Sequence, residues 1–201
     1  MSRRVIVALV VSAFLAAPAK STDEAADYSS TEGAEISLAD AEIYRFDYFM
    51  NTSEDIWVYN TTESQPKGCK KDKKHNETTT RIVFVRSHQE GNDTKNATLI
   101  GDFVNYFENY TYYDVMDISG DKSGVYAERL YYMSTDRNCG LVQVFAAARY
   151  KDDYNVWNEL RVRGRPEYSS LDEECRKEYE AYAEAITNKR NLTSPYRRDC
   201  R

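Results

Sequence analysis

The feature that most constrains the fold is a series of short segments rich in β-branched and aromatic residues, separated by hairpin-length turns. In one of them Thr80, Ile82 and Phe84 alternate with the residues between them, which is the period-two pattern of a strand. Strands are predicted at residues 56–59, 78–87, 97–107, 110–116, 125–133, 140–148 and 155–162, and turns at 60–68, 91–96, 117–124, 134–138 and 150–153. About eight short strands joined in this way indicate a mainly β domain, either an antiparallel barrel or a sandwich.

Helical patterns occur at both ends of this series. Leu38, Ala41, Tyr44 and Tyr48 are spaced by three and four residues, which predicts a short helix before the first strand. Residues 170–173 (Ser-Leu-Asp-Glu) form a capping box, the usual start of a helix. After it, one helical face carries Leu171, Cys175, Tyr179, Tyr182 and Ile186. We expect this second helix to pack outside the β domain with Cys175 pointing inward, and we expect one domain over residues 36–201.

The N-terminus has the pattern of a secretory signal peptide. Arg3 and Arg4 precede an apolar run at 5–17, which is shorter than the roughly 20 residues needed to cross a bilayer. Small residues then lead to an expected cleavage after Ala19. A short buried helix is the alternative interpretation of this run. Residues 20–35 are small, polar and acidic, and are expected to be mobile, so the mature product is predicted to be secreted and extracellular.

Cysteines and glycosylation motifs agree with an extracellular protein. The four cysteines are an even number, and four cysteines allow three disulfide pairings. Seven Asn-x-Ser/Thr motifs are present, and these acceptor positions are expected at the surface. They are Asn51, Asn60, Asn76, Asn92, Asn96, Asn109 and Asn191. Asn60, Asn76, Asn92 and Asn96 fall in segments predicted to be loops.

Charge and motif content exclude several classes of function. The net charge is −6, and loss of Arg3 and Arg4 with the signal peptide would make it −8, which argues against nucleic acid or an anionic membrane as partner. The chain has two histidines and no Cys-x-x-Cys, so no metal and no cofactor is expected. Hydrolase, metalloprotease, phosphate-loop and dinucleotide motifs are all missing from the sequence. A binding protein is therefore favoured over an enzyme.

A closed barrel of eight strands has an interior just wide enough for one small ligand. Tyrosine is unusually frequent, with 17 copies, which suggests an aromatic-lined pocket. In segment 125–133, one face carries Tyr126, Glu128, Leu130 and Tyr132, and the other carries the residues between them. Alternation alone leaves open which face lines the interior.

Four marks in order give the chain a resemblance to a known family. They are Glu54-Asp55-Ile56-Trp57, Cys139-Gly140-Leu141, Val156-Trp157, and a terminal Tyr196 followed by Cys200. Over about residues 35–201 the chain resembles the tick salivary lipocalins of the histamine-binding protein family. The resemblance implies an eight-stranded lipocalin (calycin-like) barrel and the disulfides Cys69–Cys200 and Cys139–Cys175. Members sequester host histamine, serotonin, leukotrienes or thromboxane, and some bind complement or modulate immune cells.

Departures from the family's amine-binding pattern bear on the ligand. Gly140 and Asn155 stand where that pattern has acidic residues, and a desolvated ammonium group needs a carboxylate partner. A lipid or neutral host mediator is therefore favoured. Biogenic-amine binding, and a protein-binding immunomodulator that uses the barrel as a scaffold for a host immune protein, are the alternatives. The candidate ligand-binding residues are Glu54, Trp57, Phe84, Asp102, Tyr126, Glu128, Tyr132, Asn155 and Trp157.

Overall fold

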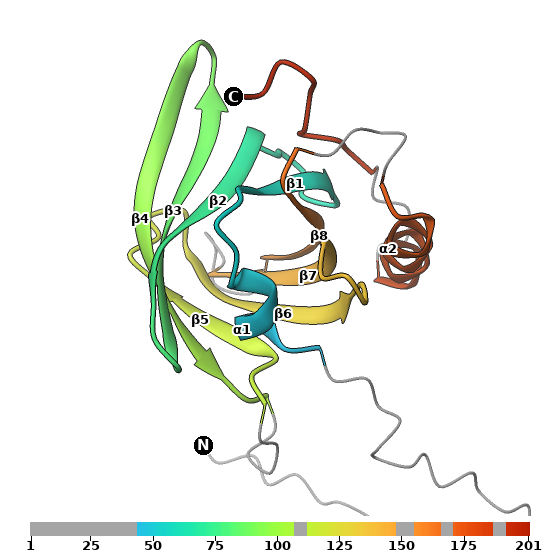
Figure 1. The fold of residues 1–201 in the computed structure, drawn as a ribbon. Coiled ribbons are helices and arrows are strands. Elements are labelled where there is room, and N and C mark those ends of the chain that lie inside the picture. Colours follow the sequence, from blue (N-terminus) through green and yellow to red (C-terminus); the bar gives the residue numbers. More distant parts are fainter. Residues whose placement is uncertain (1–43, 107–111, 148–154, 166–170, 187–191) are drawn as a thin grey trace, which may run out of the picture. The chain divides into compact units, whose positions relative to one another are not determined.

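The computed structural model describes residues 44–106, 112–147, 155–165, 171–186 and 192–201; the predicted signal peptide and segment 20–35 lie outside this part of the chain. The described chain forms a closed barrel in which each strand pairs antiparallel with the next and the last pairs with the first (Figure 1). The strands are β1 (Ile56–Thr61), β2 (Gly68–Glu77), β3 (Arg81–Glu90), β4 (Asp93–Val104), β5 (Val115–Ser119), β6 (Val125–Met133), β7 (Cys139–Ala146) and β8 (Asn155–Arg163). The helices are α1 (Phe46–Met50) and α2 (Glu173–Ile186). The barrel is confirmed, and the sandwich alternative is wrong.

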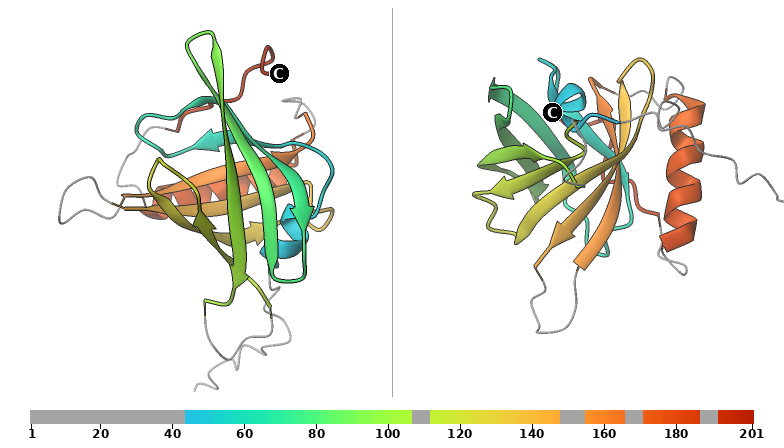
Figure 2. Two further views of the ribbon diagram at one scale, coloured as in Figure 1. Left: turned by 90° about the vertical axis from the view of Figure 1, so that its left-hand side faces the viewer. Right: turned by 90° about the horizontal axis from the view of Figure 1, so that it is seen from below.

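Some strand boundaries differ from the prediction. No strand was predicted where β2 lies, because its ten residues carry no apolar alternation: Lys70 and Asp72 are its buried polar positions, and they are buried by ion pairing. β4 begins at Asp93 and β5 extends to Ser119, so the predicted turns at 91–96 and 117–124 are too long. The β3–β4 hairpin projects beyond the barrel, where backbone pairing continues without a core (Figure 2).

The short helix α1 lies at one end of the barrel (Figure 1). Phe46, Phe49 and Met50 are buried in the same core as inward-facing strand residues such as Leu130 and Phe103. The guanidinium of Arg163 at the end of β8 donates hydrogen bonds to the carbonyl of Phe49. The predicted N-terminal helix is confirmed from Phe46 onward, and residues 38–43 lie outside the described chain.

The second helix, α2, packs on the outside of the barrel against β6, β7 and β8 (Figure 2). Its face was predicted correctly for Cys175 and Tyr179, which are fully buried, and for Leu171 and Tyr182, which pack against the same cluster. The side chain of Asp172 accepts a hydrogen bond from the backbone N–H of Glu174 and so caps the first turn. Ser170 and the side chain of Ile186 lie outside the described part.

Two disulfides tie the outer elements to the barrel, with the partners that the resemblance implied. Cys139–Cys175 joins β7 to α2, and Cys69–Cys200 joins β2 to the C-terminal segment. The second bridge packs with Trp57 and Tyr196, whose rings meet edge to face with centroids 5.4 Å apart. Both bridges therefore hold segments that are not barrel strands against the barrel wall.

The glycosylation motifs divide between a turn and the strands. Asn92 lies in the exposed β3–β4 turn as predicted, but the loop prediction is wrong for Asn60 (β1), Asn76 (β2) and Asn96 (β4). The side chains of Asn51, Asn76, Asn92 and Asn96 are exposed, and that of Asn60 is half-buried. Asn109 and Asn191 lie outside the described residues. Glycosylation itself stays a prediction.

Candidate ligand-binding site

A cavity of about 1110 Å³ opens at the end of the barrel opposite α1. Its walls come from the β1–β2 loop, from the beginnings of β2, β6 and β8, from the middle of β4, and from the last residues of β3 and β7. The apolar part of the wall consists of Ala97, Leu99, Val125, Ala146, Val156 and Trp157. Charged side chains reach the same space from Glu63, Lys70, Arg86 and Asp121. The cavity thus combines a patch of apolar wall with a larger number of polar side chains, and concave sites with both kinds of group are where small molecules bind.

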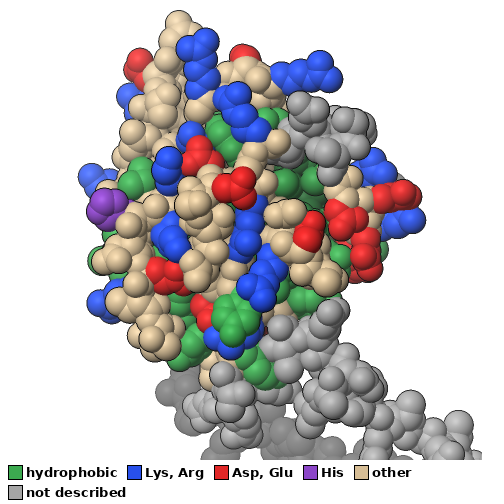
Figure 3. Space-filling view, in the orientation of Figure 1, with side chains coloured by type: hydrophobic (Ala, Val, Ile, Leu, Met, Phe, Trp, Pro, Cys, Tyr) green, Lys and Arg blue, Asp and Glu red, His purple; other side chains and the backbone are tan. Residues whose placement is uncertain are grey.

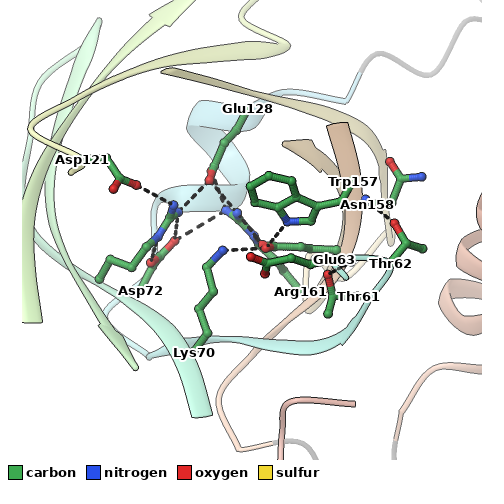
Figure 4. Close-up of polar contacts among 12 residues, drawn as sticks. Thr61, Thr62, Glu63, Lys70, Asp72, Asp121, Glu128, Trp157, Asn158 and Arg161 are labelled. Carbon is green, nitrogen blue, oxygen red and sulfur yellow. Dashed lines mark hydrogen bonds and ion pairs between the residues drawn. The ribbon is translucent and has the colours of Figure 1, made fainter. Parts of the chain in front are cut away.

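The floor of the cavity is a cluster of six buried charges, which we call the charged floor: Lys70, Asp72, Arg86, Glu128, Glu159 and Arg161 (Figure 4). It contains three cations and three anions, contributed by β2, β3, β6 and β8. In β8, Trp157 lies on the cavity side of the cluster, and in β3, Phe84 lies on its other side, in the core that α1 closes. The charged floor therefore separates the open cavity from the apolar core that α1 closes.

Arg161 is the centre of the charged floor. Its Nη1 and Nη2 donate to the two carboxylate oxygens of Glu128 at 2.7 Å each, and its Nε and Nη2 donate to Glu159 Oε2 at 2.9 and 2.7 Å. Glu159 Oε1 accepts from Lys70 Nζ at 2.6 Å and from the indole N–H of Trp157 at 2.9 Å. Bidentate guanidinium–carboxylate pairs of this kind are the strong, directional form of ion pair.

Arg86 forms the second half of the charged floor. Its Nε and Nη2 donate to the two oxygens of Asp72 at 2.8 and 2.7 Å, and Nη2 also lies 2.8 Å from Glu128 Oε1. Each carboxylate oxygen of Asp72, Glu128 and Glu159 thus has at least one donor. Arg86 Nη1 differs, because it is buried and has no hydrogen-bond partner among the described residues. Asp121 Oδ2 lies 3.9 Å from this atom.

The electrostatics keep these carboxyl groups ionised. Burial alone would raise the pKa of Glu128, but the attraction of Arg161 and Arg86 outweighs burial and lowers that pKa to about 2. For Glu159 the same competition, with Lys70 and Arg161 as the main partners, lowers the pKa well below its usual value. At the cavity wall, burial raises the pKa of Glu63 against the opposing effect of Lys70.

Of the nine candidate binding residues, the structure brings three to the cavity or its floor: Glu128, Asn155 and Trp157. Phe84 is inside the barrel but on the α1 side of the charged floor, where the guanidinium of Arg86 lies 5.5 Å from its ring. Asp102 is on the outer surface in a pair with Arg81. These five residues therefore do not form one site.

Two further candidates, Glu54 just before β1 and Trp57 in β1, also lie outside the cavity. Glu54 is exposed and close to Gly164. Trp57 is buried beneath the C-terminal segment beside the Cys69–Cys200 bridge, with Lys71 Nζ 4.7 Å from its ring. Both were candidate ligand-binding residues, and neither side chain is among the cavity residues.

Tyr126 and Tyr132 lie outside the barrel although Glu128 lies inside. The pairing of β6 with β7 shifts register between Val125 and Ala127 and again between Leu130 and Tyr132. Each bulge turns the following side chains to the other face. Tyr126 is therefore 43% exposed beside Phe145, and Tyr132 packs against Tyr44.

Gly140 and Asn155, treated above as one altered amine subsite, are at opposite ends of the β7–β8 ladder. Gly140 pairs with Arg161, whereas Asn155 pairs with Ala146 at the cavity. A Cβ atom at Gly140 would lie 3.0 Å from both the Phe49 ring and the Leu130 side chain. An acidic side chain at position 140 would therefore crowd Phe49 and Leu130, and it would lie far from position 155.

Sequence reasoning missed most of the charged floor. Lys70, Asp72, Arg86, Glu159 and Arg161 were not among the candidates. A signal was present in β8, where Trp157, Glu159 and Arg161 occupy alternate positions between residues that are themselves apolar or buried. Charged residues at alternate positions of a strand whose two faces are both buried indicate paired charges inside the protein, because a buried charge is stable only with a partner.

The comparisons with known proteins identify the fold. No protein-family model matches the chain, and no curated protein matches it in sequence. Among solved structures, the siderocalin Ex-FABP aligns with a TM-score of 0.53 and 6% identity over 74% of this chain and 93% of that one. A bovine odorant-binding protein gives 0.52 and 12% over 73% and 95%, and a dog lipocalin allergen gives 0.53 and 11% over 75% and 97%. The chain therefore has the lipocalin fold.

Proposed function

We propose that the protein is a secreted lipocalin of the tick salivary type that binds a small amphipathic host mediator in its barrel and so removes it from inflammation or haemostasis. One observation carries the proposal: a cavity of about 1110 Å³, with an apolar patch on its wall, stands over a floor whose charges are already paired. Apolar surface buried in such a cavity contributes about 25 cal/mol per Å², enough for an alkyl or ring system to bind. The activity is binding rather than catalysis.

The charged floor argues against the amine alternative. On the charged floor an ammonium ligand would find no carboxylate oxygen without a donor, because those of Asp72, Glu128 and Glu159 are all engaged by Lys70, Arg86 or Arg161. The carboxylates of Glu63 and Asp121 line the same cavity, but an ammonium group that approached them would also meet the cations Lys70 and Arg86. The unused hydrogen-bonding capacity of the floor is a donor, Arg86 Nη1. A lipid or neutral ligand is therefore favoured, as the sequence suggested, but for a different physical reason.

Secretion is supported by the two disulfides, which are typical of proteins that fold in an oxidising compartment. No helix in the described residues is long and apolar enough to cross a membrane. Basic and acidic side chains are interspersed over the surface seen in Figure 3. The membership of the tick salivary family rests on the sequence resemblance.

Native mass spectrometry of the secreted protein tests the proposal, because a bound small molecule adds a discrete mass. Calorimetric titration with leukotriene B4, serotonin and histamine should then show binding of the lipid and weak or no binding of the amines. Val125→Trp fills the cavity and should abolish lipid binding, whereas Tyr126→Trp, its neighbour on the outer face, should leave it unchanged. Submicromolar histamine affinity, or equal behaviour of the two variants, would contradict the proposal.

A further inference from the structure

We propose that the cavity recognises an alcohol: a ligand hydroxyl sits between Arg86 Nη1 and Asp121 Oδ2, accepting a hydrogen bond from the first and donating one to the second. This inference rests on the proposed function and specifies its ligand as a neutral amphiphile that carries a hydroxyl group. The observation behind it is the Nη1 atom of Arg86, a residue of the cavity lining, which is buried without a hydrogen-bond partner in the described chain.

The geometry of the pair leaves room for one oxygen. Nη1 and Oδ2 are 3.9 Å apart, too far for a direct hydrogen bond. An oxygen at an ordinary hydrogen-bond distance of about 2.8 Å from each would bridge them. Arg86 is held in place by Asp72 and Glu128, so Nη1 cannot turn away to find another partner without breaking those contacts.

Asp121 is also held in position. Its Oδ1 accepts a hydrogen bond of 2.6 Å from the backbone N–H of Ser123, which leaves Oδ2 facing Arg86 (Figure 4). The preceding Gly120 has a φ of +88° and packs so close to β4 that an added Cβ would lie 3.1 Å from the Thr98 carbonyl oxygen. The β5–β6 turn is thus fitted tightly against the barrel with its carboxylate directed at the cavity floor.

Donor and acceptor chemistry selects a hydroxyl over charged head groups. A hydroxyl both donates and accepts, so it satisfies the two atoms together. A carboxylate on the ligand would accept from Arg86 but would meet the negative charge of Asp121. An ammonium group would donate to Asp121 but would meet the positive charges of Arg86 and, on the same floor, Lys70. An ether oxygen would satisfy only Arg86.

Four probes with the same twelve-carbon chain test this selection at neutral pH: 1-dodecanol, methyl dodecyl ether, dodecanoate and dodecylammonium. Calorimetric titration of the full-length secreted protein should show 1-dodecanol binding about tenfold tighter than the other three, the order expected from one or two net hydrogen bonds. Equal affinities, as expected if water alone bridges Arg86 and Asp121, would overturn the inference. Tighter binding of dodecanoate would also overturn it and would assign the floor to an anionic head group.

The variant Asp121→Asn removes the hydrogen-bond acceptor of the proposed site and leaves the donor, Arg86 Nη1, in place. Its amide oxygen can still cap the N–H of Ser123, which puts an N–H₂ donor where Oδ2 was, so the hydroxyl loses its acceptor and a carboxylate gains a donor. Binding of 1-dodecanol should fall about tenfold and that of dodecanoate should rise. The control is Asp117→Asn, which changes an exposed carboxylate on β5 and should alter neither the affinity for 1-dodecanol nor that for dodecanoate. Identical behaviour of the two variants refutes the hydroxyl site, whereas failure of all four probes to bind refutes the proposed function as well.

Discussion

Replacing Glu128 by glutamine tests whether the charged floor holds the barrel together. Glu128 is fully buried and accepts two hydrogen bonds of 2.7 Å from Arg161, with Arg86 also in contact at 2.8 Å. Its pKa falls from 4.5 to about 2, and each pKa unit corresponds to about 1.4 kcal/mol, so its ionised form contributes about 3 kcal/mol to folding. Removing one partner of a buried ion pair costs a similar amount of stability, about 3–5 kcal/mol.

The sign of the pH dependence follows from the lowered pKa. The unfolded chain takes up the proton near pH 4.5 and the folded one only near pH 2, so this stabilisation is complete above about pH 4.5 and is lost as the pH falls towards 2. Glu128→Gln should therefore lower the free energy of unfolding by about 3 kcal/mol at pH 7. The difference from the unchanged protein should shrink between pH 4.5 and 2.

Guanidinium chloride unfolding across this pH range, with both disulfides intact, measures the effect. Glu173→Gln is the control, because Glu173 is an exposed residue paired with Lys177 on α2, and such surface changes stay within about 0.5 kcal/mol. A Glu128→Gln variant as stable as this control at pH 7, or with an unchanged pH dependence, would refute the role given to the charged floor.

Four further predictions concern separate parts of the molecule. Replacing both Cys139 and Cys175 by serine should lower stability by about 3–4 kcal/mol, measured by chemical unfolding, because the bridge closes a loop of 36 residues. Gly140→Asp should destabilise the barrel by about 1–3 kcal/mol without conferring histamine binding in calorimetry, because its Cβ meets Phe49. Asn155→Asp, in contrast, should fold normally and strengthen histamine binding if any amine enters the cavity. Treatment with a glycan-removing amidase should lower the mass of the secreted protein, with Asn92 among the sites identified by peptide mapping.

The strands that sequence patterns predicted well are those with an apolar inner face. In β3 the alternation of Ile82 and Phe84 with less buried neighbours identifies the strand directly. In β2 the inner positions are Lys70 and Asp72, whose burial depends on Glu159 and on Arg86 from other strands. No local pattern could reveal β2, because the groups that make its burial favourable are distant in sequence.

The binding residues were predicted less well than the fold, because assigning side chains to the inner or outer face by alternation assumes a strand without bulges. Two bulges in β6 place Val125, Glu128 and Leu130 inside the barrel and leave Tyr126 and Tyr132 outside. A bulge depends on how a strand pairs with its neighbour, so it leaves no clear mark on the strand's own sequence.

By itself, the sequence determined a mainly β domain of short antiparallel strands, the outer helix and its apolar face, because hydrophobic periodicity and turn residues act locally, while the choice of a barrel rested on the family resemblance. Only the tertiary structure decided that six charges from four strands meet inside the barrel and that one donor, Arg86 Nη1, is left facing the cavity. The physical reason is that a buried charge is stable only with partners of opposite sign, and barrel closure brings these partners together from positions up to 89 residues apart, as for Lys70 and Glu159.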